Sequence, residues 1–594
     1  MKIMNINIKV WLIGGLIFSA SLLNSCTDNW LAPDPLSTFT PENVYVDEEG
    51  FESLLITMRK NIKDEHYGFF SWSTAEYVSS DLAVGGYGPD FSFLTPTGTP
   101  ERYPVDDMFG DIYEYLKDPN VLISRIDEVE WQDQSIRNRL LAEAFWHRAY
   151  LYYRLIHSYG DVPWIGEELK GAKLDFTTHT RWAILDKIQR DLEWAVEWMP
   201  ESAPPRVPTK YAGWHLLAKI YLANTEFDKA IEAATNVING PFALMTNRFG
   251  SWSDDPARNV IWDLFRHENI YNGQNTETIL GLVDRAEAPE EARRYRSMAA
   301  NFNPHWWDVK DVDGQRGIEY PSALMDTVMR GQGITVSNKY FQYKIWGDEN
   351  SSWETTTDLR RSDINWIEMR EIRYNVADSP NFGERIEQRW STPSDTTLRW
   401  FPWPHYKTYN PTSQEESTWG GGNGDWYLFR LAETYLIRAE AYYWNEQLAQ
   451  AAADINEVRL RANASSITGA DVTIDYIFDE RARELYMEEP RHTEMVRVSN
   501  IMARLNINGY DLDNIGQQSW WYDRVMRVND LYNQPPGTWW SSQSVTIEPY
   551  NIYWPIPQNI ITANTQGTIN QNYGYEGYQN NSTPLDTIED TIEK

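Results

Sequence analysis

The sequence predicts an all-α protein, in which a tetratricopeptide-like helical-repeat scaffold is interrupted by a large, irregular, aromatic-rich insertion. Apolar residues recur at helical spacing from Pro41 to about residue 240 and again after residue 420. Between these regions the helical periodicity is patchy, and Gly, Pro and Trp occur often. The apolar fraction of 42% is enough to bury a sizeable core, so the chain is not expected to be disordered.

The repeat assignment depends on three copies of one pattern. In residues 214–237, the small residues Ala218 and Ala230 occur where two antiparallel helices would touch, and Trp214 and Tyr221 would fill the space beside them. The same spacing of small, aromatic and aliphatic residues recurs in Tyr435, Ala439, Tyr442, Leu448, Ala451, Ile455 and Val458. A third copy, which residues 160–180 split in two, comprises Phe145, Ala149, Tyr152, Leu192, Ala195 and Pro200.

The N-terminus has the features of an export signal followed by an anchor. Lys2 and Lys9 precede an apolar run that ends at Leu23, which is too short to span a bilayer. The run leads to Cys26, the single cysteine of the chain, and resembles the lipobox of bacterial lipoproteins, in which the cysteine is acylated. An ordinary secretory signal with a chance cysteine is the alternative.

Charge and cysteine content exclude several classes of protein. The chain has 86 Asp and Glu against 53 Lys and Arg, a net charge of −33, which excludes a general nucleic-acid binder. One cysteine excludes a disulfide scaffold and any CxxC site.

The resulting organisation has six parts. We expect a signal peptide (1–25), a lipid-anchored tether (26–40), an N-terminal repeat scaffold (41–240) with a ligand loop near 82–105, an irregular insertion that is a candidate for ligand binding (241–420), a C-terminal repeat scaffold (421–575) and a loose acidic tail (576–594).

Ordered motifs along the mature chain resemble one family. They are Arg148–Leu155 with Tyr159–Pro163, Arg430–Glu433 with Leu436–Ala441 and Ile455–Arg459, Glu480–Leu485 with Glu488, Arg491 and Arg497, Tyr553–Pro557, and Gln571–Tyr575. Together they are similar to the signatures of the SusD/RagB-like outer-membrane nutrient-binding lipoproteins of Bacteroidota. Pro490 and Glu494 depart from the usual third signature, where Gly and Asp are common.

The resemblance implies a protein that is lipid-anchored to the outer membrane at the cell surface, uses no cofactor and is not an enzyme. Its implied partner is a SusC-like TonB-dependent transporter, to which it would hand a polysaccharide or oligosaccharide. A peptide-binding uptake lipoprotein of the same family and a glycoside hydrolase remain the alternatives.

The charged motifs admit two interpretations. Glu480, Arg483 and Glu484 place opposite charges on one helix, and Glu433 and Glu440 lie in an otherwise apolar repeat helix. Such carboxylates could perform acid–base chemistry. Because an arginine occurs near each acid, ion pairs that tie helices together are the favoured interpretation. The acids of residues 308–319 are similarly interpreted as a solvated loop rather than a Ca²⁺ site.

Candidate ligand residues come from the loop and the insertion, because sugar rings stack on exposed aromatic rings and sugar hydroxyls require polar partners. They are Asp81, Tyr87, Phe91, Phe93, Trp306, Trp307, Trp346, Trp353 and Arg360. The alternative for each aromatic residue is a place in the core. The acidic balance favours a neutral glycan, although clusters such as Arg360–Arg361 oppose that preference.

Overall fold

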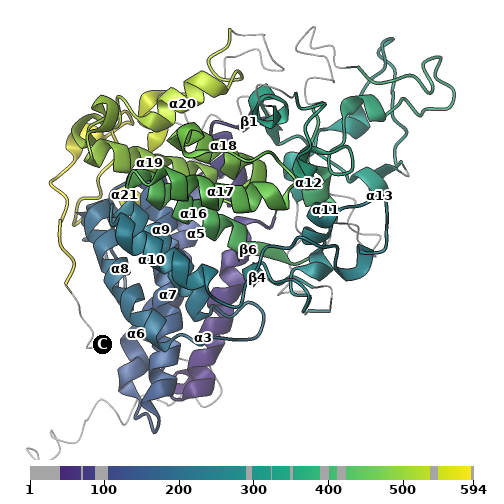
Figure 1. Ribbon diagram of the computed structural model, residues 1–594. Coiled ribbons are helices and arrows are strands. Elements are labelled where there is room, and N and C mark those ends of the chain that lie inside the picture. Colours follow the sequence, from purple (N-terminus) through teal and green to yellow (C-terminus); the bar gives the residue numbers. More distant parts are fainter. Residues whose placement is uncertain are drawn as a thin grey trace, which may run out of the picture.

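The structure is a computed structural model that describes residues 41–68, 71–86, 105–285, 287–288, 298–322, 324–347, 352–387, 400–410, 423–535 and 546–589. Helices dominate the described part, and the three sheets within it have two strands each. Long helices fill one side of the molecule and an irregular region lies on the other (Figure 1). The predicted all-α class is confirmed.

The N-terminal helices lead into one long helix that runs through the core. The bounds are α2 (Pro41–Val44), α3 (Glu48–Asn61), α4 (Trp72–Val78), α5 (Val105–Tyr115), α6 (Lys117–Arg125) and α7 (Gln134–Tyr159). The Asp133 carboxylate caps α7 by accepting a hydrogen bond from the Ser135 backbone N–H. At the other end, Gly160 adopts a φ of 69°, which favours glycine and stops the helix.

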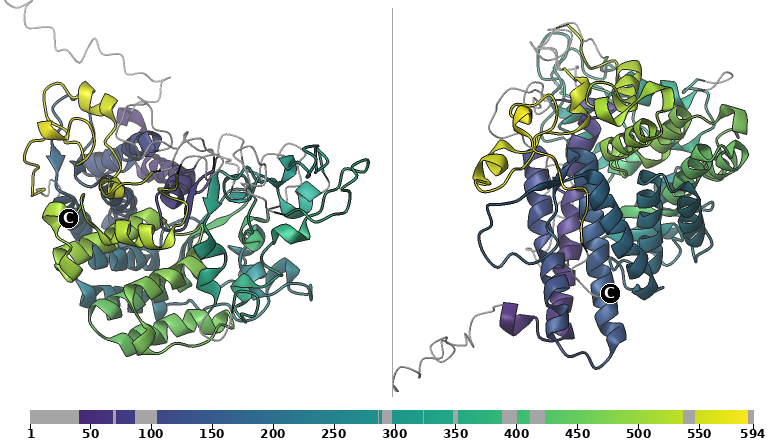
Figure 2. Two further views of the ribbon diagram at one scale, coloured as in Figure 1. Left: turned by 90° about the horizontal axis from the view of Figure 1, so that it is seen from above. Right: turned by 90° about the vertical axis from the view of Figure 1, so that its left-hand side faces the viewer.

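Three helix pairs form the predicted repeats. They are α7 with α8 (Arg181–Trp198), α9 (Lys210–Ala223) with α10 (Phe227–Ile238), and α16 (Leu431–Trp444) with α17 (Leu448–Arg461). Both Ala218 and Ala230 are fully buried, as the small-residue contact requires. Helix α10 packs against α16 (Figure 2). The two repeats to which these helices belong are therefore neighbours in space, although the long insertion separates them in the sequence.

The C-terminal helices cover this stack. Helix α18 (Ile474–Leu485) packs on α16 and α17, and α19 (Arg491–Arg504) packs on α7 and α9. Helices α20 (Trp520–Val528) and α21 (Gln558–Ala563) follow.

The irregular region has a small core of its own, in which Trp306, Trp400 and Trp403 are fully buried. Its short helices are α11 (Val260–Leu264), α12 (Met298–Phe302), α13 (Leu324–Val328), α14 (Lys339–Gln342) and α15 (His405–Thr408). Strand β4 (Thr278–Leu282) pairs antiparallel with β6 (Trp426–Arg430), which runs directly into α16. This pairing ties the insertion to the repeat scaffold.

Two further sheets join distant segments. Strand β1 (Ala83–Gly85) pairs with β5 (Thr335–Ser337), which links the end of the α4 segment to the irregular region. Strand β2 (Val162–Pro163) pairs with β3 (Thr178–His179) inside the insertion that splits the third repeat copy.

The C-terminal segment corrects one expectation, because residues 576–589 are held in place and are not a loose tail. Leu585 exchanges backbone hydrogen bonds with Thr178 and Thr180 at 2.9 and 2.8 Å. Asn570 and Ser582 bond to each other through side-chain and backbone groups at 2.8 and 2.9 Å. The polar composition of this segment predicts mobility, but protein groups take the place of water as its hydrogen-bond partners.

Candidate functional site

The structure separates the predicted ligand residues into three groups. Tyr87, Phe91 and Phe93 lie outside the described residues, as does Cys26, the predicted lipid anchor. Four others are buried, and the remaining two, Trp307 and Trp353, are half-buried in the irregular region.

Trp306 and Trp346 are core residues. The Trp306 side chain is fully buried, and its indole N–H donates to the Met329 carbonyl at 2.7 Å. The Trp346 indole N–H donates to the Phe341 carbonyl at 2.6 Å, and 4% of the residue is exposed. Neither offers a free ring face, so the expected stacking role is corrected to a structural one.

Asp81, which was expected to contact a ligand, is instead a buried structural residue. Its carboxylate accepts two hydrogen bonds from Arg491 at 2.8 Å and one from Arg524 at 2.6 Å. Burial alone would raise the pKa of Asp81, but these two guanidinium groups lower it to about 2.

Arg360 has the same kind of role. It is 1% exposed and forms ion pairs with Asp358, Glu480 and Glu484 at 2.7, 2.8 and 2.9 Å. With its donors occupied in the interior, it is not placed to hold a ligand, and the expected clamp role is corrected.

The other charged motifs also form buried ion pairs. Glu433 pairs with Lys219 at 2.7 Å, and Glu440 pairs with Arg497 at 2.6 Å. Burial alone would raise the pKa of Glu433, but the charges of Lys219 and Arg481 lower it. The carboxylates are therefore ionised partners that hold α9, α16 and α19 together, as the ion-pair interpretation predicted.

The acidic loop makes internal contacts rather than gathering ligands. Asp311 accepts hydrogen bonds from the backbone N–H groups of Asp313 and Gln315 and from the side chains of Ser379 and Asn381. Across the described residues, no three His, Cys, Asp or Glu side chains gather as metal ligands. In the same part of the chain, the helices are too short or too polar to cross a bilayer.

Trp307 forms an aromatic shelf with Tyr320, a residue that the sequence interpretation did not select. The two ring centroids are 5.1 Å apart, and Tyr320 is 44% exposed. The Trp307 indole N–H donates to the Gly331 carbonyl at 2.8 Å, which fixes the ring. The Arg330 guanidinium carbon lies 4.3 Å from the Trp307 ring centroid, and exposed Arg316 lies 5.4 Å from that of Tyr320.

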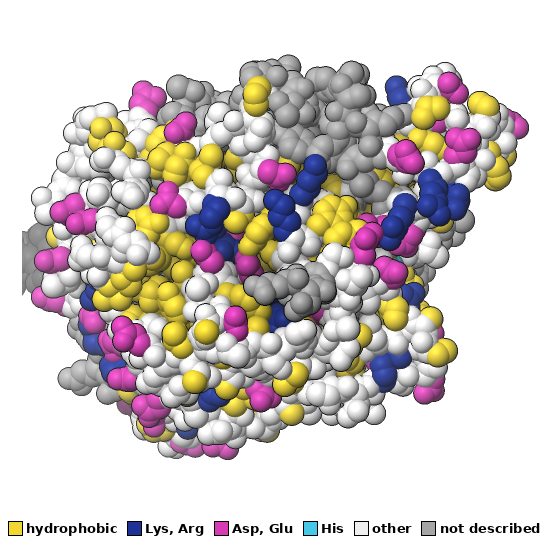
Figure 3. Space-filling view, turned by 45° about the horizontal axis from the view of Figure 1, so that its top comes forward, with side chains coloured by type: hydrophobic (Ala, Val, Ile, Leu, Met, Phe, Trp, Pro, Cys, Tyr) yellow, Lys and Arg dark blue, Asp and Glu magenta, His cyan; other side chains and the backbone are white. Residues whose placement is uncertain are grey.

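This shelf has the chemistry that a sugar requires. An aromatic ring that is partly exposed can pack against the C–H face of a pyranose, while nearby guanidinium N–H groups can donate to its hydroxyls. On the face shown in Figure 3, basic, acidic and apolar side chains intermingle over the irregular region at the right.

Trp353 is a second partly exposed ring in the same region. Its centroid lies 5.2 Å from that of Tyr343, and the guanidinium carbons of Arg361 and Arg370 lie 4.6 and 5.7 Å from its ring. Arg361 is held by Glu368, whereas the Arg370 side chain is half exposed.

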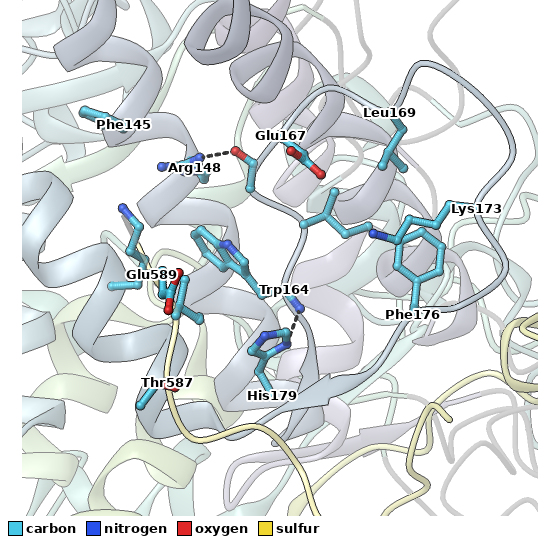
Figure 4. Close-up of a pocket in the computed structure, with 14 residues that line it drawn as sticks. Phe145, Arg148, Trp164, Glu167, Leu169, Lys173, Phe176, His179, Thr587 and Glu589 are labelled. Carbon is cyan, nitrogen blue, oxygen red and sulfur yellow. Dashed lines mark hydrogen bonds between the residues drawn. The ribbon is translucent and has the colours of Figure 1, made fainter. Parts of the chain in front are cut away.

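A cavity of about 280 Å³ near the third repeat copy also went unpredicted (Figure 4). Trp164 borders it and is stacked on Tyr152 at 4.4 Å, with the Arg148 guanidinium carbon 5.1 Å from its ring. Arg148 and Lys187 both bind Asp191, at 2.7 and 2.5 Å. Because Trp164, Arg148 and Lys187 already have these protein partners, the cavity is less suited to a sugar than the shelf.

Family models match most of the chain. The SusD family model matches residues 261–575, and a model described as "Starch-binding associating with outer membrane" matches residues 45–222. SusD-like protein P25 of Formosa agariphila is 23% identical over 525 residues, which cover 84% of this chain and 90% of that protein. The starch-binding protein SusD of Bacteroides thetaiotaomicron is 25% identical over 63% of this chain and 66% of its own length.

Solved structures share the fold. A laminarin-binding SusD-like protein superposes with a TM-score of 0.60 and 19% identity, covering 89% of this chain and all of that one. The surface glycan-binding protein A of Bacteroides thetaiotaomicron, in complex with laminarihexaose, superposes with a TM-score of 0.62 and 16% identity over 88% of this chain and 99% of that one. Because the SusD family model covers more than half of the sequence, this chain belongs to the SusD family.

Proposed function

We propose that this protein binds a polysaccharide or oligosaccharide at the outer-membrane surface, where Cys26 anchors it through lipid, and passes the glycan to a SusC-like TonB-dependent transporter. The relatives support the ligand class, since several are named for binding starch, laminarin or glycan. The family model that matches residues 45–222 supports association with the outer membrane.

The observation that carries the proposal is the aromatic shelf of Trp307 and Tyr320. Its rings are fixed by protein contacts yet remain partly exposed, so binding would cost little side-chain ordering. Trp353 is proposed as an additional contact in the same region, and Tyr87, Phe91 and Phe93 remain candidates from the preceding loop.

A screen of the soluble chain without residues 1–26 distinguishes the possible functions. We expect retention in native gels that contain laminarin, starch or another neutral glycan, without release of reducing sugar. Binding of oligopeptides but of no glycan would instead identify a peptide-uptake protein. Release of reducing sugar would identify a hydrolase.

A further inference from the structure

A second cavity, of about 420 Å³, lies where the start of α8 meets the loop after α19 and the C-terminal segment. Its lining includes Arg181 and Trp182 from α8, Asn514 from the loop, and Tyr573 from the C-terminal segment. Its volume lies within the range of known small-molecule sites. It contains none of the ligand residues that the sequence suggested, and it is separate from the aromatic shelf.

Arg181 is the unusual residue of this cavity. It is 3% exposed, yet all three of its guanidinium nitrogens are buried without a hydrogen-bond partner, which is true of no other arginine in the described part of the chain. Its guanidinium carbon lies 4.5 Å from the Trp182 ring centroid. A buried charge without hydrogen bonds is costly, so this position favours a ligand that supplies acceptors.

The Arg181 guanidinium does not pair with Asp161, an acid that lines the same cavity. The Asp161 carboxylate accepts a hydrogen bond from the Arg181 backbone N–H at 2.8 Å, rather than from the side chain. By contrast, Arg491 binds both carboxylate oxygens of Asp81 at 2.8 Å. Burial lowers the pKa of Arg181, as expected for a cation whose partner is missing.

Two further groups in the cavity are available to a ligand. The Asn514 Oδ1 is buried without a hydrogen-bond partner, and the Tyr573 ring is 47% exposed. Nearby amides are already committed, since Asn572 donates to the carbonyls of Tyr159 and Trp554. The cavity thus offers one unpaired cation, one unpaired acceptor and one exposed aromatic ring, and the carboxylates of Asp161 and Asp513 also line it.

We propose that this cavity binds a uronate, a sugar ring that carries a carboxylate. The carboxylate would accept paired hydrogen bonds from Arg181, a hydroxyl would donate to Asn514 Oδ1, and the ring would pack against Tyr573. Salt screens the net charge of −33 beyond about 8–10 Å, so the charges that matter are those lining the cavity, where Arg181 attracts a carboxylate and Asp161 and Asp513 repel it. The proposal does not rest on the aromatic shelf.

Calorimetric titration of the soluble chain with glucuronate, glucose and acetate tests this inference. We expect glucuronate to bind at least ten times more tightly than either glucose or acetate, since each lacks part of the recognised chemistry. Arg181→Gln should weaken glucuronate binding at least tenfold. Arg504→Gln is the matched control, because the exposed Arg504 contacts Trp182 but does not line the cavity.

If Arg181→Gln does not fold, Asn514→Ala and Tyr573→Ala test the same site, and each should weaken glucuronate binding severalfold. Trp307→Ala should leave glucuronate binding unchanged, which separates this site from the proposed glycan shelf. The inference is overturned if glucuronate does not bind, if these variants bind it as the wild type does, or if acetate binds equally well.

Discussion

Trp306 and Trp307 are neighbours in the chain but lie in opposite environments. Trp306 is fully buried in the core of the irregular region, whereas Trp307 is half-buried and lies beside the exposed ring of Tyr320. Each indole N–H donates to a backbone carbonyl, at 2.7 Å from Trp306 and 2.8 Å from Trp307. Adjacent positions therefore differ in role, since Trp306 supports the core and Trp307 is the residue proposed to bind the glycan.

Trp306→Ala should lower the free energy of unfolding by roughly 3–5 kcal/mol, because it leaves a cavity in a packed core. Trp307→Ala should cost much less, since part of the ring is already in water. Denaturant unfolding of both variants measures the difference. Equal losses would show that Trp307 belongs to the core as well.

Ala230→Leu should destabilise the protein by roughly 1–3 kcal/mol. Ala230 is fully buried in α10, which packs against both α9 and α16, so added methyl groups overpack the contact. Glu232→Leu, at an exposed position of the same helix, is the control and should change the unfolding midpoint little. A midpoint unmoved by Ala230→Leu would contradict the repeat packing.

Asp81→Asn should lower stability at pH 7 by roughly 2–3 kcal/mol, given that the carboxyl pKa falls from 3.8 to about 2. A carboxyl group whose pKa is lowered on folding stabilises the folded state at pH values above its pKa in the unfolded chain. That contribution disappears as the pH falls from about 4 to about 2. The stability difference between wild type and Asp81→Asn should therefore shrink over this window.

Asp186→Asn serves as the comparison for Asp81. Asp186 forms an ion pair with Arg190 on the surface of α8, where its side chain is 63% exposed. Exposed pairs contribute little, so this variant should differ from wild type by less than about 1 kcal/mol. A constant difference for Asp81→Asn from pH 5 to pH 2 would argue against the buried ion pair.

Cys26→Ala should abolish incorporation of labelled fatty acid and release the protein from the outer membrane, because it removes the proposed site of acylation. Ser25→Ala keeps a small residue before the cysteine and should still be labelled. Labelling of Cys26→Ala would show that the anchor lies elsewhere.

Regular parts of the fold could be predicted because helical periodicity and small residues are visible in the sequence. Leu192 and Ala195 of the third predicted copy are buried on helix α8, and Thr180 caps the first turn of that helix. In the irregular region no periodicity distinguishes a buried ring from an exposed one, so Trp306 and Trp346 were grouped with Trp307. The role of Asp81 depends on Arg491 and Arg524, which lie more than 400 positions away, and sequence spacing does not reveal such pairs.

The most direct test of the glycan-binding proposal is the dissociation constant of a retained neutral glycan for the double variant Trp307→Ala/Tyr320→Ala. Trp198→Ala is the control, because Trp198 is 40% exposed but lies on α8, in the repeat scaffold. We predict that the double variant binds at least about tenfold more weakly than wild type while its melting temperature changes little. Wild-type affinity in the double variant, or an equal loss in Trp198→Ala, would contradict the proposal that the aromatic shelf holds the glycan.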